Sequence, residues 1–378
     1  MIRAREAVER LQKYHPPLEG RAGLLRLDFN ENTVGCPPAV VRAFRRAIRP
    51  DWFARYPEYE EGCGILARYF GVAPQEMLLT NGVDDAIKLI CDTFVDPGEV
   101  MAIPSPTFPI YEFFHELAGG KTRLIHYNDK LELPVKDFLD AMGRRARWVA
   151  LANPNNPTGT LIPKADLKTI LEAVPGTIVL VDEAYFDFSG LTILSWIRKY
   201  QNLIVSRTFS KAFGLAAIRT GFLFTNRRVA DLMRRAHAAF AVNAAALACA
   251  LEAIRHEDYV RRYAKMVCRN RERFCRQLED MGIPYAPTAA NFVLTRVGPR
   301  AHEIAMRLRR QGILVRDWSY DPHLKGYLRM TVGTTAQMKR LTAELERLRH
   351  LMETRDGSGA WRDLMTYSPT GWFALKAL

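Results

Sequence analysis

The sequence predicts an α/β fold with one large domain and one smaller α+β domain. Three observations lead to this prediction: the chain length, the recurrence of short apolar segments between residues 77 and 225, and a change of pattern after residue 225. A chain of 378 residues with 48% hydrophobic and 25% charged residues is long enough for two globular domains. We expect the large domain to hold a seven-stranded, mostly parallel sheet flanked by helices, and both chain ends to form the smaller domain.

The large sheet is predicted from segments that suit buried strands. Most of them are separated by helical stretches such as 83–94 and 164–173. This alternation is typical of a sheet with helices on both faces. The candidate strands, in chain order, are MLLT, VMAI, RLIH, RWVALA, TIVLVD, NLIVS and GFLFT.

The smaller domain is predicted from helices that alternate with only a few strands. The strands are NFVLTR and YLRMTV, and the helical stretches lie at about 227–255, 258–281, 299–311 and 335–353. The predicted division is 1–48 for an N-terminal arm and part of the small domain, 49–255 for the large domain, 256–353 for the small domain and 354–378 for a tail. The tail carries Trp361, Trp372 and Phe373, so packing on the surface and packing on a partner both stay open.

The basic composition raises the question of a nucleic-acid partner. The net charge is +13 and the pI is about 9.6. Arginines cluster in residues 255–282, but apolar residues recur there at helical spacing, which predicts one long amphipathic helix with a solvated basic face. Without a stacking platform or finger motif, charge alone indicates solubility and steering. We therefore expect a small anionic substrate and no nucleic acid.

Composition also bears on membranes, metals and compartment. No apolar run approaches the roughly 18 residues that span a bilayer, and the charged N-terminus lacks the apolar stretch of a signal peptide. The six cysteines contain no C-x-x-C pair and have no metal-ligand spacing with the histidines. We expect reduced thiols, no metal, no membrane association and a cytoplasmic protein.

Polar residues follow several of the predicted strands. Each of these residues has an ordinary structural explanation as a helix cap, a turn residue or a solvated strand end. Together they lie at the ends of consecutive strands of one predicted sheet, where α/β proteins bind ligands. They are Asn155 or Asn156 in the turn 153–159, Asp182, Glu183 and Tyr185 after TIVLVD, Lys211 after NLIVS, the helix that starts near Gly82, and Arg55 and Tyr56 before a proline.

One ligand needs all of these groups, and it is pyridoxal 5'-phosphate. Its aldehyde needs a lysine amine, and its phosphate needs a helix N-terminus, hydroxyls and an arginine. Its pyridinium nitrogen needs a buried carboxylate, because the cationic ring takes up electrons from the substrate carbanion. Its phenolic oxygen needs donors such as an Asn amide and a Tyr hydroxyl.

The chain resembles the fold-type I pyridoxal-phosphate-dependent aminotransferases, most closely the histidinol-phosphate aminotransferase family and its aromatic relatives. The resemblance covers roughly residues 24–350, and it is the order of the motifs that makes it specific. The motifs are LDFNENT, ARYPEYE, NGVDDAIKL, PSPTFPIYE, NPNNPTG, VDEAYFDF, SRTFSKAFGLAAIRTGF and GILVRD with YLRMTVGT.

The resemblance implies a role for each residue that matches a family motif. Lys211 matches the lysine that forms the Schiff base and moves the proton between the substrate Cα and the cofactor. Asp182 matches the partner of the pyridinium nitrogen, and Asn156 and Tyr185 match the partners of the phenolic oxygen. Phe108 matches the aromatic residue that stacks on the ring, where the family often has tyrosine.

The phosphate side is likewise implied by the resemblance. Tyr56 matches the tyrosine that reaches the phosphate and substrate from the neighbouring subunit, which implies a homodimer with a shared active site. The positions within one chain are Gly82, Val83, Asp84, Thr208, Ser210 and Arg219.

The substrate side is implied by two arginines and an asparagine. Arg329 matches the arginine that binds the substrate carboxylate or phosphate, and Arg316 matches a second arginine for the phosphate of histidinol phosphate. Asn30 belongs to the N-terminal segment that approaches the substrate or the subunit interface. Thr33 stands where the family usually has proline after N-E-N, which leaves the exact substrate open.

The resemblance implies transamination between an amino acid or amino-alcohol phosphate and a 2-oxo acid such as 2-oxoglutarate. Histidinol phosphate or an aromatic amino acid is the favoured donor. A decarboxylase of the threonine-phosphate type on the same fold is the alternative, since sequence does not fix which Cα bond breaks. A nucleic-acid-binding regulator is a third interpretation. The roughly 20 residues ahead of LLRLDFNENT argue against it, because they are too few for a helix-turn-helix module.

Overall fold

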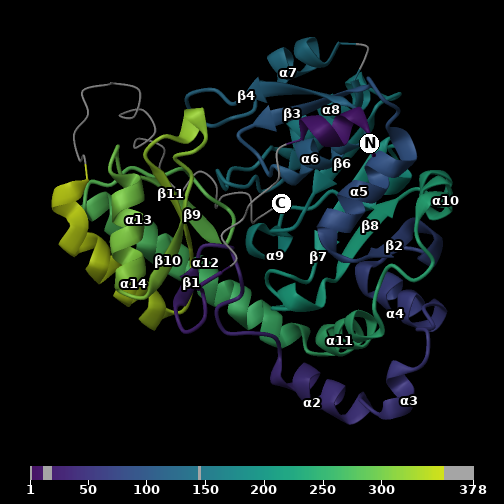
Figure 1. The fold of residues 1–378 in the computed structure, drawn as a ribbon, viewed down its shortest axis with the longest axis horizontal. Helices are drawn as coiled ribbons and strands as arrows, with labels where there is room; N and C mark the ends of the chain where they lie inside the picture. Colours follow the sequence, from purple (N-terminus) through teal and green to yellow (C-terminus); the bar gives the residue numbers. More distant parts are fainter. Residues whose placement is uncertain (1, 12–18, 144–145, 353–378) are drawn as a thin grey trace.

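A large mostly parallel sheet dominates the computed structural model, which describes residues 2–11, 19–143 and 146–352. Its seven strands have the order β2-β8-β7-β6-β5-β3-β4 (Figure 1). β8 is antiparallel to both of its neighbours, and the remaining pairs are parallel. The strands are β2 (Met77–Thr80), β3 (Val100–Ser105), β4 (Lys121–His126), β5 (Ala146–Ala152), β6 (Ile178–Asp182), β7 (Leu203–Thr208) and β8 (Gly221–Thr225). Each of the predicted strands is present, so this part of the predicted fold is confirmed.

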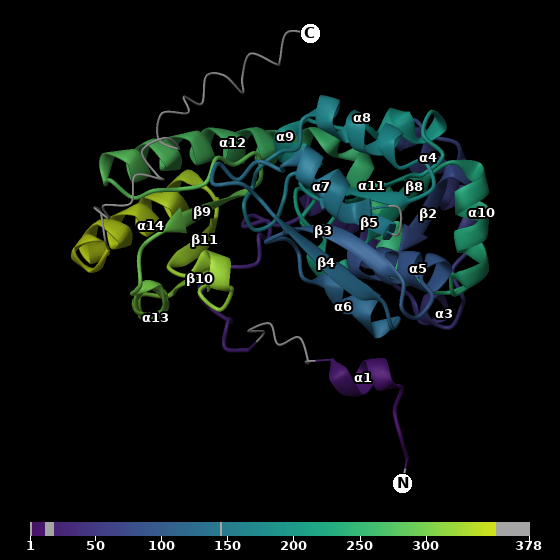
Figure 2. The same ribbon diagram turned by 90° about the horizontal axis from the view of Figure 1, so that it is seen from above.

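Helices cover both faces of this sheet, because the strands carry apolar side chains on both faces. In β6, Leu180 belongs to the apolar cluster beneath one set of helices, whereas Val179 and Val181 belong to the cluster on the other face. The first set is α5 (Gly82–Phe94), α6 (Ile110–Leu117) and α10 (Arg227–Ala236). The other face packs on α4 (Glu60–Phe70), α7 (Val135–Met142), α8 (Lys164–Ala173) and α11 (Ala244–Arg255). Figure 2 shows α5 and α6 on one side of the sheet and α8 on the other.

A second sheet combines both ends of the chain, as predicted. Its four strands have the order β1-β10-β11-β9, and β1 runs parallel to β10. The strands are β1 (Leu25–Leu27), β9 (Phe292–Arg296), β10 (Ile313–Asp317) and β11 (Tyr327–Thr331). The helices of this region are α12 (Glu257–Asp280), α13 (Ala301–Arg310) and α14 (Thr335–Leu348). The remaining helices are the short α1 (Glu6–Arg10), α3 (Pro50–Phe53) and α9 (Phe186–Ser189), and α2 (Pro38–Ala47).

The structure refines two of the predicted helices. The stretch 227–255 is two helices, α10 and α11, because Asn243 begins a new helix with its side chain accepting a hydrogen bond of 2.8 Å from the backbone of Ala246. The long basic helix is α12, whose buried face includes Val260, Val267 and Phe274. Its arginines lie mostly on the solvated side, as the amphipathic pattern predicts. The predicted tail, 354–378, lies outside the described residues.

Two expectations from the composition, about membrane spans and metal sites, can be compared with the described residues. Across the ranges given above, the structure has no helix that is both long and apolar enough to cross a membrane. The same ranges contain no group of three His, Cys, Asp or Glu side chains placed to hold a metal ion. The six cysteines are all free thiols.

Candidate active site

The strand register brings the predicted site residues to one edge of the large sheet. The parallel strands β5, β6 and β7 end side by side, with Ala152 opposite Asp182 and Asp182 opposite Ser206. At the end of β7, Thr208 lies opposite Gly221 of β8, which in turn lies opposite Thr80 of β2. The turns that follow β2, β5, β6 and β7 therefore share this edge, which is where open α/β sheets bind ligands.

Asp182 is a buried carboxylate on the face that packs against α5 and α6. Its Oδ1 accepts hydrogen bonds from Ser206 Oγ at 2.8 Å and from the Ala184 backbone at 3.1 Å. Its Oδ2 accepts one from the Tyr111 hydroxyl at 2.6 Å. Burial raises the pKa of Asp182, and the bonds from Tyr111 and Ser206 partly oppose that rise. All three of these donors are neutral, so a cation beside Asp182 would favour its ionised form.

Glu183, the next residue, faces the opposite way. It is buried and accepts two hydrogen bonds from the Arg207 guanidinium, at 2.8 and 3.0 Å, and one from the backbone of Ile193 at 2.8 Å. Burial raises the pKa of Glu183, and Arg207 lowers it. Since successive strand residues point to opposite faces, only one of the two adjacent carboxylates can reach the site. Glu183 is a structural residue that fixes the segment after β6.

Tyr185 lies between the two sheets. Its hydroxyl accepts a hydrogen bond of 2.9 Å from the Asn30 side chain, and its ring packs edge-to-face on Phe292 with the ring centres 5.2 Å apart. Asn30 is buried and has a left-handed backbone with φ of 56°, which asparagine tolerates better than most residues. Its predicted contact with the substrate stays a prediction, and its observed side-chain contacts are with Tyr185 and Thr331.

Lys211 lies beside these groups. Its Nζ donates a hydrogen bond of 3.1 Å to the Phe29 backbone oxygen, and it is 5.7 Å from the centre of the Tyr185 ring. The side chain is partly buried. The amine therefore comes from the turn after β7 and faces the N-terminal segment.

The structure distinguishes Asn155 from Asn156. Asn155 is engaged by its own turn and by the segment after β3: its Oδ1 accepts from Thr107 at 2.7 Å, and its Nδ2 donates to Pro106 O at 3.0 Å and to Thr158 at 2.9 Å. Asn156 instead accepts a hydrogen bond from the Arg329 guanidinium. Of the two asparagines, Asn156 is the one directed to the other predicted site residues.

The two predicted substrate arginines lie side by side on neighbouring strands of the small sheet. Arg316 of β10 and Arg329 of β11 are register partners in an antiparallel pair, so their side chains leave the same face. Arg329 is buried and donates 2.6 Å to the Asp28 backbone oxygen. The Arg316 guanidinium lies 5.9 Å from the Phe29 ring centre and 5.7 Å from that of Tyr320. Two adjacent guanidinium groups favour an anion on this face.

The predicted phosphate side is built around the start of α5. Gly82 has φ of 81°, and a Cβ on it would overlap the Arg219 guanidinium. Arg219 has a left-handed backbone with φ of 60° and pairs with Asp84 at 3.2 Å. The side chain of Asn81 does not cap the helix, so the N–H groups of the first turn, which includes Val83, are available to a ligand.

Two hydroxyls complete this side. The Thr208 hydroxyl donates to the Ser210 hydroxyl at 2.9 Å, and both residues are buried. Because Thr208 is in register with Gly221, whose backbone lies against Gly82, the hydroxyls and the helix start are neighbours. Helix N–H groups, hydroxyls and a guanidinium form the donor set that a phosphate ester requires.

The two predicted aromatic contacts have different outcomes. Phe108 follows β3 and packs edge-to-face on Tyr111, with ring centres 5.6 Å apart, so it lies close to Asp182. Tyr56 is not brought to the site of its own chain. It is 76% exposed and stacks on Phe240 at 4.3 Å. Its predicted role across a subunit interface stays a prediction.

Sequence reasoning missed Tyr111 and Ser206 as partners of Asp182. Both could have been found from periodicity: Tyr111 lies three residues after Phe108 on the start of a helix, and Ser206 lies two residues before Thr208 on a strand. Residues at these spacings share a face. Phe29 was also missed, because it acts through its backbone oxygen and its ring rather than through a charged group.

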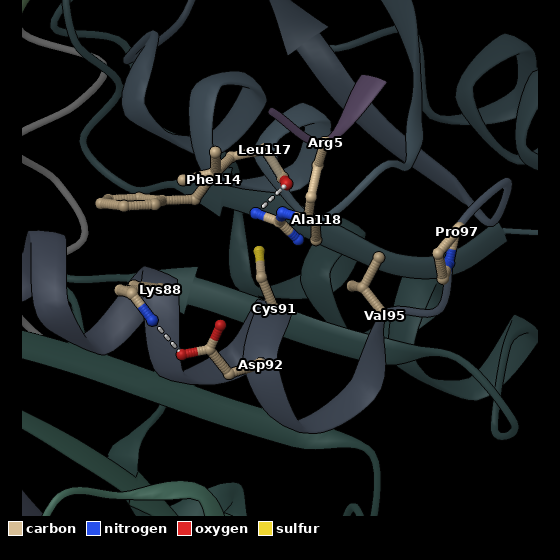
Figure 3. A pocket seen from close by; sticks show the side chains of 9 residues that line it. All are labelled: Arg5, Lys88, Cys91, Asp92, Val95, Pro97, Phe114, Leu117 and Ala118. Carbon is tan, nitrogen blue, oxygen red and sulfur yellow. Dashed lines mark hydrogen bonds and ion pairs between the residues drawn. The ribbon is translucent and has the colours of Figure 1, made fainter. Parts of the chain in front are cut away.

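The hollows elsewhere on the molecule lie apart from this edge. The one in Figure 3, of about 280 Å³, lies between α5, α6 and the N-terminal segment. Its polar residues are already engaged: Arg5 donates to Leu117 O at 3.1 Å, and Lys88 pairs with Asp92. None of the predicted site residues lines it.

A two-sheet α/β architecture with an amine, a buried acid and a phosphate-type donor set at one sheet edge defines a pyridoxal-phosphate enzyme of fold type I. Comparison with known proteins makes this specific: residues 22–345 match the model of the family described as aminotransferase class I and II, and the chain belongs to that family. Membership confirms the predicted aminotransferase and its pyridoxal phosphate cofactor, with a small-molecule substrate.

Three similar proteins place the chain within the family. Histidinol-phosphate aminotransferase 2 of Carboxydothermus hydrogenoformans is 34% identical over 359 residues, which cover 90% of this chain and 98% of the relative. The crystal structure of histidinol-phosphate aminotransferase from Sinorhizobium meliloti, in complex with pyridoxal-5'-phosphate, is 27% identical with a TM-score of 0.85 and covers 93% of this chain and 98% of its own. The L-threonine-O-3-phosphate decarboxylase of Porphyromonas gingivalis is 25% identical with a TM-score of 0.75, over 86% of this chain and 100% of its own.

We predict that Gly82→Ala weakens binding of pyridoxal phosphate by at least about 10-fold, because the added Cβ displaces the Arg219 guanidinium from the start of α5. The affinity is measured by titrating the cofactor-free protein with pyridoxal phosphate. Gly98→Ala is the matched control: Gly98 also has a positive φ, of 88°, but a Cβ there meets nothing within 4 Å. Equal affinities of the two variants would contradict this role of Gly82.

Proposed function

We propose that this aminotransferase moves an amino group between histidinol phosphate and a 2-oxo acid such as 2-oxoglutarate, with aromatic amino acids as secondary donors. The observation that carries the proposal is the register pairing of Arg316 and Arg329. A guanidinium fork suits a phosphate and a carboxylate alike, so one arginine pair can serve a phosphorylated amino alcohol and then a dicarboxylic acid. The names of the similar proteins support the same substrate.

The chain's own residues account for how the cofactor is held. When bound, pyridoxal phosphate supplies an aldehyde carbon that takes the amino group and a protonated ring that accepts negative charge. Asp182 would face the ring nitrogen, and Tyr185 with Asn156 would face the phenolic oxygen. Phe108 would lie on the ring. The phosphate would take the donors at the start of α5 and in the turn after β7, namely Gly82, Val83, Asp84, Thr208, Ser210 and Arg219.

Lys211 is the proposed acid–base residue. Its amine would bind the cofactor between turnovers, and once released it would take the proton from the substrate Cα and deliver it to the cofactor carbon C4'. The observed contacts support this role: the amine lies at the Tyr185 ring and is held by the Phe29 backbone oxygen rather than by a carboxylate. Because the partner of the amine is an uncharged oxygen and not a carboxylate, less energy is needed to move the amine from this position.

We also propose that the active enzyme is a homodimer with shared sites. Tyr56 is 76% exposed on its own chain, and it stacks on Phe240, which is 56% exposed. Val34, Val41 and Phe53 are exposed as well. Exposed apolar side chains of this size favour burial against another protein surface, and a second copy would bring Tyr56 to the phosphate.

The domain division is part of the proposal. In this division, residues 49–255 would carry the cofactor contacts, and residues 256–353 with part of 1–48 would carry the substrate arginines; the predicted tail, 354–378, lies outside the described residues. The cytoplasmic location predicted from the sequence is supported by six free cysteines, since thiols stay reduced in that compartment.

We predict that Lys211→Ala abolishes turnover while the fold is retained, because no other amine takes its place in the reaction. Borohydride treatment of the wild-type protein with bound cofactor should attach the cofactor covalently to Lys211, as measured by peptide mass mapping. Lys199→Ala is the control, since Lys199 is a surface lysine of the same domain. Labelling at another lysine would overturn the assignment.

The substrate is tested by adding histidinol phosphate, glutamate, phenylalanine and threonine phosphate separately and following cofactor absorbance. A transaminase converts the cofactor to its amine form with the true donor, and we expect the largest change with histidinol phosphate. Release of CO2 from threonine phosphate without cofactor conversion would instead establish the decarboxylase alternative.

We predict that Arg316→Gln raises the KM for histidinol phosphate by about 10-fold or more, because one of two phosphate-binding guanidinium groups is lost. The KM for phenylalanine, which has no phosphate, should change less. Arg310→Gln, an exposed arginine of α13 in the same part of the fold, is the control. Equal changes for both substrates would contradict the assignment of Arg316 to phosphate.

The shared site can be tested by mixing two inactive variants. Tyr56→Ala and Lys211→Ala homodimers, mixed and allowed to exchange subunits, should regain about one quarter of the wild-type activity, since half of the dimers are hybrids with one intact site. The activity is compared with that of each variant alone. A mixture that stays inactive after exchange has been verified would rule out sharing.

A further inference from the structure

Helix α6 carries a tyrosine, Tyr111, that is both packed in the core and hydrogen-bonded to the buried acid Asp182. Tyr111 is completely buried, and its hydroxyl donates the hydrogen bond of 2.6 Å to Asp182 Oδ2. The other carboxylate oxygen is bound by Ser206 and by the backbone of Ala184. Tyr111 is therefore the side-chain donor to Oδ2, and it reaches Asp182 from helix α6.

His115, one turn later on α6, fixes the helix against the sheet. Trp148 of β5 donates from Nε1 to His115 Nδ1 at 3.1 Å, so Nδ1 carries no proton and the neutral ring carries it on Nε2. His115 Nε2 lies 3.2 Å from both Glu99 O and Lys121 O. Burial lowers the pKa of His115, which keeps the ring in this neutral form. The helix cannot rotate or slide without breaking these bonds.

The same tyrosine contacts the aromatic residue of the cofactor site. The Tyr111 ring meets Phe108 edge-to-face, at 5.6 Å between centres and an angle of 87°. Phe108 and Tyr111 are therefore in direct contact at the start of α6. A shift of this helix would displace both the ring that would stack on the cofactor and the donor to the acid beneath it.

We propose that Tyr111 is a positioning residue that keeps Asp182 ionised and directed at the ring nitrogen of pyridoxal phosphate. The inference rests on the cofactor of the proposed function and not on the identity of the substrate. A neutral hydroxyl that donates to one carboxylate oxygen stabilises the anion without competing for the other oxygen's partners. The proton shared with the cofactor then stays on the ring nitrogen, where it supports catalysis.

The groups around Asp182 determine the sign of the expected pH dependence. Asp84 acts on Asp182 from α5 and raises its pKa, in the same direction as burial, while Tyr111 from α6 and Ser206 from β7 lower it. Tyr185 and Tyr127 face Tyr111, whose own pKa is raised well above its usual value by burial, so its hydroxyl keeps its proton. Removing the Tyr111 hydroxyl therefore moves the pKa of Asp182 further upward.

The test is the affinity of the cofactor-free protein for pyridoxal phosphate between about pH 6 and about pH 9. With Tyr111→Phe, Asp182 is protonated over more of the acidic range and loses its attraction for the ring cation. We expect binding about 10-fold weaker near pH 6, with the difference from wild type shrinking as the pH rises and Asp182 ionises. This readout does not depend on turnover.

Tyr200→Phe is the matched control. Tyr200 is also a buried tyrosine of the large domain that donates to a carboxylate, Glu172, at 2.9 Å, but it lies away from Asp182. It should change the melting temperature without changing the cofactor affinity at any pH. Ser206→Ala removes the donor to the other oxygen of Asp182, and it should reproduce the pH pattern of Tyr111→Phe.

Each outcome decides the matter. A Tyr111→Phe protein with wild-type affinity for the cofactor at every pH would overturn the inference. An affinity lowered equally at every pH would overturn it as well, because a loosened helix α6 would weaken binding without any dependence on pH. Wild-type protein that does not bind pyridoxal phosphate at all would instead overturn the cofactor assignment on which the inference rests.

Discussion

The burial of one carboxylate is the constraint on which the rest of the site depends. Asp182 ends a central strand of the large sheet, and its neighbours Leu180 and Val181 pack in the apolar clusters on either face. An ion in such a place is costly unless it is hydrogen-bonded and paired with a cation. Neutral donors alone leave its pKa raised. The protonated ring of the bound cofactor would supply the positive charge that these neutral donors lack.

The N-terminal segment contacts residues that follow strands of the large sheet and a residue of the small sheet. Residues 28–30 touch both sheets: the Asp28 backbone oxygen accepts from Arg329, the Phe29 backbone oxygen accepts from Lys211, and Asn30 donates to Tyr185. The segment is held in turn by a buried pair in which Arg21 donates two bonds to Asp28, at 2.8 and 3.0 Å. A buried ion pair of this kind contributes more to a unique geometry than to net stability. The contacts of the site therefore require the N-terminal segment together with the small sheet.

Charge has two different roles in this molecule. Exposed arginines of α12 include members of surface ion pairs such as Arg261 with Glu257, and such pairs contribute little to stability. The charges that we propose for the chemistry are placed by the sheets: Asp182 on the large sheet, and Arg316 with Arg329 on the small one. The apolar pattern of α12 accounts for its clustered arginines as the solvated face of an amphipathic helix.

The sequence by itself predicted the strands of the large sheet, the α/β class and the polar residues that follow the strands, because short apolar runs and turn residues are local signals. The turn chemistry alone did not choose between Asn155 and Asn156, although the family resemblance assigned Asn156, and the contact of Tyr111 with Asp182 and the placing of Asn30 against Tyr185 were not predicted. These contacts join residues between 71 and 173 positions apart in the chain. Only the tertiary structure decides them, because strand order and helix packing bring such distant residues together, and no local pattern encodes that order.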